Sequence, residues 1–168
     1  RAQDRTRVDI VDLNEDSYRF AAIPRGAYQR VGVEFRPGRF GYGALVPGTG
    51  KPREGYYMPN VILDANKLIN IPAMKMNAGG GTLVFKNYVG AFASIPYGDG
   101  FGKSQMDRYG FAQGMVDIFS YQPAVYSVIA GFWASERDWP TRTQNLHHNV
   151  VVAGGNAVAV EATALRIM

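Results

Sequence analysis

Residues 124–132 read AVYSVIAGF, residues 149–153 read NVVVA, and residues 157–168 read AVAVEATALRIM. The first two segments are short, apolar and rich in β-branched residues, which is typical of buried strands. The third repeats apolar residues at helical spacing after the sequence GGN (154–156), in which the asparagine suits a helix cap. Two strands followed by a helix favour a sheet with a helix packed on it.

Segments nearer the N-terminus extend this pattern. KLINIPAMK (67–75) predicts a buried strand that Pro72 terminates, and PNVILDAN (59–66) suits a short helix begun by Pro59. Residues 105–119 carry apolar side chains at helical spacing. Strands separated by helical stretches predict an α/β fold with a mixed or mostly parallel sheet and helices packed on it.

The C-terminal helical segment also predicts which of its faces is buried. Val158, Ala162, Leu165 and Met168 recur at three- and four-residue intervals. Residues at that spacing share one face of a helix. We therefore expect these four side chains to face the sheet.

The first third of the chain is less regular. Residues 7–13 (RVDIVDL) and 18–23 alternate in a strand-like way. Residues 24–57 are rich in Gly, Pro, Arg and Tyr, which predicts a long irregular insertion, ordered because its aromatic side chains can be buried. The length of the chain suits a single domain over residues 1–168 that contains this insertion.

Both ends of the chain look cut. It begins at Arg1 without an initiator methionine and ends at Met168 directly after a helical pattern. We therefore expect it to be the C-terminal part of a longer protein with a missing N-terminal region. A leader peptide would lie outside these residues, so a cytoplasmic and an exported location both stay open.

Composition narrows the classes of function. The chain has no cysteine, which removes disulfides, thiol nucleophiles and cysteine-ligated metal centres from these residues. Its apolar runs are too short to span a membrane, so we expect a soluble protein. The net charge of +4 lies entirely in residues 1–53, where basic residues are interleaved with acids and aromatics. Such a distribution disfavours nucleic-acid binding, which usually needs a dense basic surface.

Two apparent motifs favour ordinary structure. LVPGTGKP (45–52) resembles a phosphate-binding loop, but Leu45 replaces the first glycine and Pro52 replaces the residue that binds Mg²⁺, so a turn is the better reading. His147 and His148 are adjacent, and on an extended segment their side chains point to opposite faces. Two surface histidines are therefore favoured over a shared metal ion.

The segment KMNAGGGTLVFKN (75–87) combines features of an anion site. Lys75 and Lys86 supply positive charge, and Asn77 and Asn87 supply amides. Between them the triple glycine, comprising Gly79, Gly80 and Gly81, can expose backbone N–H groups to an anion. A flexible turn with solvated lysines is the alternative, and composition alone does not separate the two.

Two acids follow the strand predicted at residues 124–132. Glu136 and Asp138 lie where a strand ends, which is where ligands bind in α/β sheets. Carboxylates at this spacing can hold a divalent ion or act as a general base. An acidic loop balanced by Arg137 is the alternative, and the residues alone favour it.

These segments resemble the domain-of-unknown-function 362 family. The family pattern runs from P-K-x-K-T-H through T-L-x-x-K-N-x-x-G to a strand with D-G and a G-P-like turn, and then to A-G-x-D-x-x-A-V-D-x-x-A. Here the corresponding stretches are IPAMKMNAGGGTLVFKNYVGAF (71–92), VIAGFWASERDWP (128–140) and VVAGGNAVAVEATALRIM (151–168). Order and spacing fit over residues 58–168. The carried-over residues that fit best are Lys75, Lys86, Asn87 and Gly90.

The resemblance implies a fold and a site location more than a reaction. Asn77 stands where the family usually has histidine, and Ala130 where an acid often precedes glycine. Asn156 and Glu161 stand where aspartates are common. The family also often carries an iron–sulfur segment, which these residues lack. No cofactor or metal is assigned.

Two hypotheses of different class follow. In the first, an enzyme-like domain binds a small anionic ligand at the strand ends, where Lys75 and Lys86 neutralise its charge and Asn77 and Asn87 orient it. Glu136 or Asp138 would then serve as base or metal ligand. In the second, a non-catalytic module uses the aromatic, Arg-rich residues 18–57 to bind a partner or a second copy.

Overall fold

The centre of the fold is β6 (Tyr126–Glu136), a strand of 11 residues. The computed structural model describes residues 8–13, 15–24, 55–77, 80–91, 111–137 and 144–168. The other elements are β1 (Tyr18–Ala22), β2 (Gly55–Pro59), α2 (Asn60–Leu63), β3 (Ile69–Asn70), β4 (Ala73–Asn77), β5 (Gly80–Thr82), α3 (Val84–Asn87), the 3-10 helix η1 (Tyr88–Ala91), α5 (Phe111–Tyr121), β7 (Gln144–Leu146), β8 (Val150–Gly154) and α6 (Ala157–Ile167).

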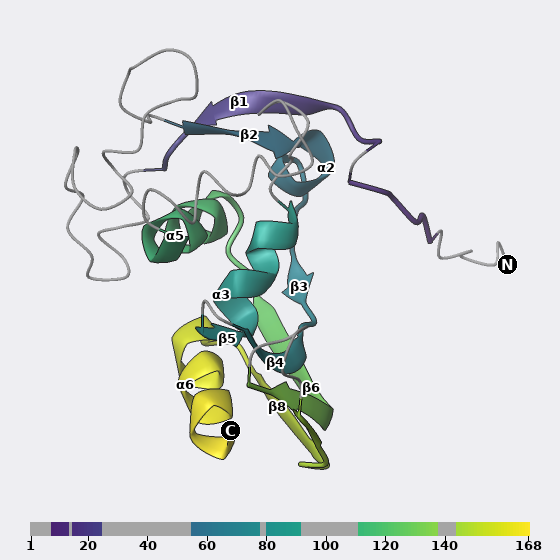
Figure 1. The fold of residues 1–168 in the computed structure, drawn as a ribbon. Coiled ribbons are helices and arrows are strands. Elements are labelled where there is room, and N and C mark those ends of the chain that lie inside the picture. Colours follow the sequence, from purple (N-terminus) through teal and green to yellow (C-terminus); the bar gives the residue numbers. More distant parts are fainter. Residues whose placement is uncertain (1–7, 14, 25–54, 78–79, 92–110, 138–143) are drawn as a thin grey trace, which may run out of the picture.

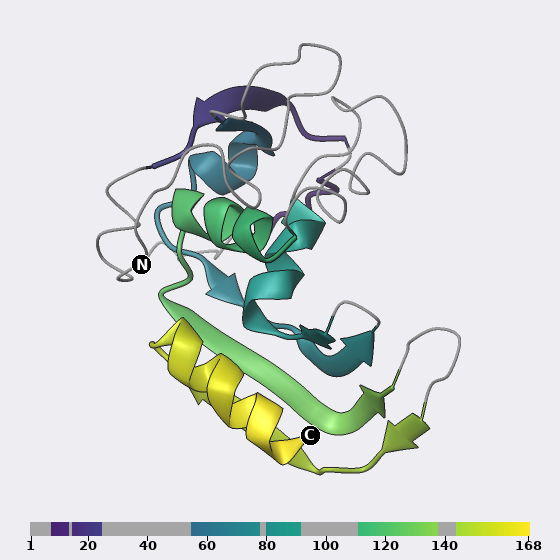
Figure 2. The same cartoon turned by 60° about the vertical axis from the view of Figure 1, so that its left-hand side comes forward.

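The main sheet is mixed, as the sequence predicts. β3 and β4 run parallel to β6, whereas β7 and β8 pair with it antiparallel. β5 returns antiparallel along β4. α6 lies along the sheet, and β1 and β2 form a separate antiparallel ribbon at the other end of the molecule (Figures 1 and 2). The predicted α/β class is therefore confirmed.

The strand predicted at residues 67–75 is divided at Pro72. β3 ends at Asn70 and β4 begins at Ala73, and both pair with the same strand, β6. Proline has no N–H to donate to a ladder, but its carbonyl can still accept. The Ala130 N–H donates to the Pro72 carbonyl at 3.0 Å, which keeps the two strands in line. Pro72 thus ends one strand, as predicted, but that strand is not buried as expected, because Ile69 is 60% exposed. The sequence reading missed the strand that follows Pro72.

α6 presents a different face to the sheet from the one predicted. Val160 and Ala164 are 4% and 0% exposed, whereas Val158 and Leu165 are 59% and 47% exposed. The prediction was wrong because this helix is apolar on nearly every side, so spacing alone does not select a face. Of the expected residues, Met168 does pack against the core, and Asn156 caps the helix by accepting from the Ala159 N–H at 3.0 Å.

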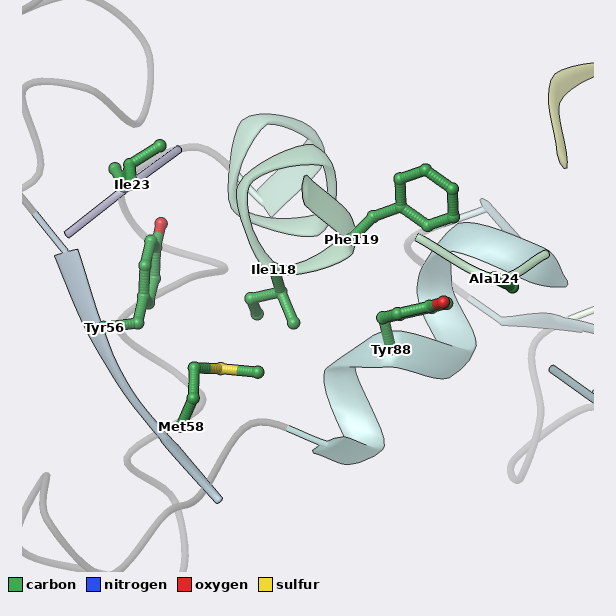
Figure 3. Close-up of a cluster of buried hydrophobic side chains, with 7 residues drawn as sticks. All are labelled: Ile23, Tyr56, Met58, Tyr88, Ile118, Phe119 and Ala124. Atoms are coloured by element: carbon green, nitrogen blue, oxygen red, sulfur yellow. The ribbon is translucent and has the colours of Figure 1, made fainter. Parts of the chain in front are cut away.

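Two groups of buried side chains stabilise the fold. The sheet cluster lies between the sheet and α6 and comprises Met74, Leu83, Val84, Ile129, Ala134, Val160 and Ala164. The ribbon cluster lies between β2, α5 and η1 (Figure 3) and comprises Ile23, Tyr56, Met58, Tyr88, Ile118, Phe119 and Ala124. Val84 and Tyr88 belong to different clusters, so α3 and η1 join the two.

Some of the elements predicted near the N-terminus are observed and others are not. β1 (Tyr18–Ala22) covers most of the strand predicted at residues 18–23, but residues 8–13 form no strand. Gly55 to Tyr57 belong to β2, so the predicted irregular segment ends before them. Residues 25–54, with the LVPGTGKP turn, and residues 105–110 of the predicted helix lie outside the described residues; that helix is observed as α5.

Buried hydrogen bonds tie the β1–β2 ribbon to α5. The Tyr56 hydroxyl donates to the Asp117 carboxylate at 2.8 Å, and Asp117 is fully buried. The Tyr121 hydroxyl donates to the Ala21 carbonyl at 2.6 Å and accepts from the Tyr56 N–H at 3.1 Å. None of the helices in the described ranges is long and apolar enough to cross a membrane.

The Tyr56–Asp117 bond predicts a stability effect. Tyr56→Phe removes a hydrogen bond to a buried carboxylate, and we expect the free energy of unfolding to fall by about 1.5–3 kcal/mol, measured by urea denaturation. Tyr57→Phe is the matched control, because Tyr57 lies on the exposed side of the same strand and should change stability by less than ~0.5 kcal/mol. Equal effects of the two variants would contradict this role of Asp117.

Candidate functional site

The candidate site is organised around α3, a helix of four residues. Its last two residues contact different strands. The Lys86 ammonium donates to the Asn77 side-chain oxygen at the end of β4. The Asn87 amide donates to Asn70 at the end of β3, at 2.6 Å. One short helix therefore serves two separate polar groups, at the carboxyl ends of β3 and β4, which follow each other in line along β6.

A carboxylate from another helix holds the beginning of α3 in place. The first N–H groups of a helix need acceptors, and the cap residue Leu83 supplies no side-chain bond. The Glu161 carboxylate of α6 accepts from the Phe85 N–H at 3.2 Å instead. Burial raises the pKa of Glu161 above its usual value, and hydrogen bonds from the Phe85 and Val84 backbone partly oppose that increase. Glu161 thus fixes the position of Lys86 and Asn87.

The glycine-rich segment forms a β-hairpin. Asn77 pairs with Gly80 and Met76 with Gly81, so β5 runs back along β4. Gly80 has a φ of +93°, a conformation that favours glycine. A side chain at Gly81 would approach Leu165 of α6 to within 2.8 Å. Gly80 and Gly81 therefore shape the hairpin that carries Asn77, and Gly79 lies outside the described residues.

A row of polar side chains crosses the sheet at Lys75. Lys75 is in register with Thr82 of β5 on one side and Ser135 of β6 on the other. Register partners on neighbouring strands present their side chains to the same face. We call Thr82, Lys75 and Ser135 the hydroxyl row. Strand alternation also places Asn77 on the same face as Lys75.

The two hydroxyls of this row are buried. Thr82 Oγ1 and Ser135 Oγ are both inaccessible, and neither has a hydrogen-bond partner among the described residues. Buried hydroxyl groups are normally satisfied by protein, water or ligand, because an unsatisfied one costs about 1–3 kcal/mol. Two such groups on either side of one lysine are a site feature that the sequence reading missed.

The predicted acid Glu136 has a histidine partner. Glu136 Oε1 lies 2.9 Å from His148 Nε2, and both side chains are largely buried. Because it neighbours Ser135 on β6, Glu136 lies on the opposite face of the strand from the hydroxyl row. The His147 ring instead lies against the Trp133 ring, so the two histidines have different partners. Asp138 lies outside the described residues.

The sequence left open that Glu136 and Asp138 bind a metal ion, but the described part of the chain contains no cluster of metal ligands. No group of three or more His, Asp or Glu side chains there is arranged to hold a metal ion. Glu136 and His148 form a pair without a third such ligand. The metal role remains a prediction that depends on Asp138.

Asn87 lines a pocket of its own with Asn70. This amide pocket measures about 450 Å³ and lies at the carboxyl end of β3. Its other lining residues are mostly apolar: Leu13, Ile62, Leu68, Ile69, Ile71, Tyr88, Gly90 and Ala91. Asn70 could have been noticed as an amide inside an otherwise apolar strand sequence. Thr82 and Ser135 could not, because only the strand register brings them to Lys75.

The Glu161 contact predicts how stability changes with pH. The pKa of Glu161 is raised in the folded protein, so the folded state holds the proton more tightly than the unfolded chain. Its contribution to stability is therefore present below the unfolded-state pKa and is lost as pH rises through the folded-state pKa. Glu161→Gln keeps an acceptor for Phe85 but does not titrate. We expect its melting temperature to fall less than that of the wild type between pH 4 and pH 8.

Glu15→Gln is the control for this pH experiment, because it removes a carboxylate from an exposed position. Parallel pH profiles of melting temperature for the wild type and Glu161→Gln would show that Glu161 does not titrate as proposed.

Comparison with known proteins identifies a family without an assigned activity. A model described as "Domain of unknown function (DUF362)" matches residues 4–166, nearly the whole chain and more than the 58–168 over which the resemblance could be followed by motif. Searches of curated proteins and of solved structures found no match. The match covers the hairpin, α3 and α6 together, and the chain belongs to the domain-of-unknown-function 362 family.

Proposed function

We propose that this chain binds a small anionic ligand at the carboxyl ends of β4 and β6. Lys75 and Lys86 would neutralise its charge, and Asn77 would orient it. The observation that carries the proposal is the bond from Lys86 to Asn77, which joins α3 to the same strand face on which Lys75 lies. In sheets with parallel strands, ligands bind at this end.

The hydroxyl row supports the same conclusion. A carboxylate or phosphate has several oxygen acceptors, and hydroxyl and ammonium groups are suitable donors to them. Thr82 and Ser135 place two hydroxyls on either side of Lys75. A local adjustment that opened the row to a ligand would let both hydroxyls form the hydrogen bonds that the described residues do not give them.

The Glu136–His148 pair is the candidate group for proton transfer. A carboxylate that holds an imidazole by one nitrogen is an arrangement used in general acid–base catalysis. The pair lies at the same strand end as the hydroxyl row, beside Ser135. Because Glu136 lies on the face of β6 opposite the hydroxyl row, we propose Glu136 and His148 for proton transfer only at the open end of the strand, and Asp138 stays a predicted member of the site.

A second candidate function is binding of a protein partner by the β1–β2 ribbon. Phe20 and Tyr57 are 49% and 37% exposed, and their rings contact each other edge to face with 5.4 Å between the ring centroids. Arg19 beside them forms an exposed ion pair with Asp64 at 2.6 Å. Exposed aromatic rings beside arginine are typical of protein interfaces. Arg19, Phe20 and Tyr57 belong to the described part of segment 18–57, residues 18–24 and 55–57.

The lysine test uses inorganic phosphate as the probe. Lys86→Gln removes the charge and keeps a long side chain, and we expect phosphate affinity measured by calorimetry to fall about tenfold or more, which corresponds to ~1.4 kcal/mol. Lys67→Gln is the matched control, because Lys67 is exposed and lies outside the site. The melting temperature should stay within a few degrees for both.

Three outcomes would reject the site: a wild-type chain that binds no phosphate, equal affinities in Lys86→Gln and the wild type, or unfolding of the Lys86→Gln variant.

The hydroxyl row predicts a trade between stability and binding. Thr82→Val replaces a buried hydroxyl with a methyl group of similar size, which removes an unsatisfied polar group. We expect the melting temperature to rise by about 2–4 °C per kcal/mol gained, while phosphate affinity falls. Thr163→Val is the control, because Thr163 lies on the exposed side of α6, and it should leave phosphate binding unchanged. Lower stability of Thr82→Val with unchanged binding would assign Thr82 a structural role only.

A further inference from the structure

The amide pocket offers a second, separate binding site. Asn70 and Asn87 are its hydrogen-bonding side chains, because the Tyr88 hydroxyl donates to the Gln122 carbonyl at 3.0 Å. Among the described residues that line it, none is charged. Apolar walls penalise an ion that enters without a partner. This pocket therefore suits an uncharged ligand.

A chain of hydrogen bonds fixes the orientation of both amides. The Val84 carbonyl can only accept, so Asn70 must turn its NH₂ group toward it, at 2.8 Å. The Asn70 oxygen is then directed at Asn87 and accepts from the Asn87 NH₂ group at 2.6 Å. Because Asn70 is only 4% exposed, this arrangement is anchored within the core. The orientation of Asn87 thus follows from a backbone carbonyl and is not arbitrary.

Asn87 keeps hydrogen-bonding capacity after this bond is made. An asparagine amide has two N–H donors and one oxygen acceptor, and only one N–H is used by Asn70. When the N–H anti to the oxygen serves Asn70, the other N–H and the oxygen remain side by side in one plane on an exposed side chain. A planar ligand that carries an adjacent acceptor and donor can bind both, as adenine does with asparagine.

We propose that the amide pocket binds an uncharged planar ligand with an amide-like edge, such as an aminopurine or a carboxamide ring. Asn87 would make the paired hydrogen bonds, Asn70 would hold Asn87 in position, and Ile69 and Ile71 would contact the apolar ring. The bidentate contact selects the edge, and the aliphatic walls select a neutral ring. This proposal does not depend on the anion site, because Lys86 bonds to Asn77 and Asn87 bonds to Asn70.

The first experiment compares 9-methyladenine with 9-methylpurine, called adenine and purine below, on the wild-type chain by titration followed with NMR. Both probes are neutral and planar, and the methyl group removes the N9–H donor, so purine lacks an adjacent donor and acceptor whereas adenine keeps its amino group. We expect adenine to bind about tenfold more tightly than purine, since a bidentate amide contact favours the matching base over a mismatched one by about that factor. Equal affinities, or no binding of adenine, would overturn the proposal without any variant.

The second experiment uses Asn87→Leu, with Asn66→Leu as the control at an exposed asparagine outside the pocket. Asn87→Leu should abolish the preference for adenine over purine, and Asn66→Leu should retain it. A retained adenine preference in Asn87→Leu would overturn the proposal. The anion site is judged by the phosphate titrations of Lys86→Gln and Lys67→Gln, so failure of one site is distinguishable from failure of the other.

Discussion

The structure depends on a single long strand, β6, with which β3, β4, β7 and β8 all pair. Because β3 and β4 both run parallel to it on one side, their carboxyl ends point the same way. Polar residues at those ends, Asn70 and Asn77, both bond to the same connecting element. That element is α3, whose last two side chains serve different candidate sites: Lys86 the anion site and Asn87 the amide pocket.

α3 is too short to be stable by itself, since isolated helices of this length do not form in water. It is stabilised by what surrounds it: Val84 is buried in the sheet cluster, Tyr88 follows it in the ribbon cluster, and Glu161 accepts from its first turn. The consequence is that the geometry of both sites depends on packing in two separate clusters. Substitutions far from any ligand can therefore alter Lys86 and Asn87 together.

Sequence reasoning identified the strands and helices whose signal is local. β6, β8 and the asparagine cap of α6 were predictable from residue type and spacing. The buried face of α6 was not, because apolar residues surround that helix and only contact with the sheet decides between Val158 and Val160. Lys75, Asn77 and Lys86 could be grouped from sequence because they flank one hairpin, whereas Thr82 and Ser135 come near Lys75 only through strand register.

The break at Pro72 has a consequence for association between molecules. On the β3 side of the sheet, the strand is two residues long and is followed by a residue that cannot donate a hydrogen bond, so an incoming chain finds little to pair with. The opposite side ends in β8, which pairs only with β6 in the described part of the chain and reads VVVAG without a charge. Strand addition and aggregation would therefore begin at β8, and the two edges of this sheet are protected unequally.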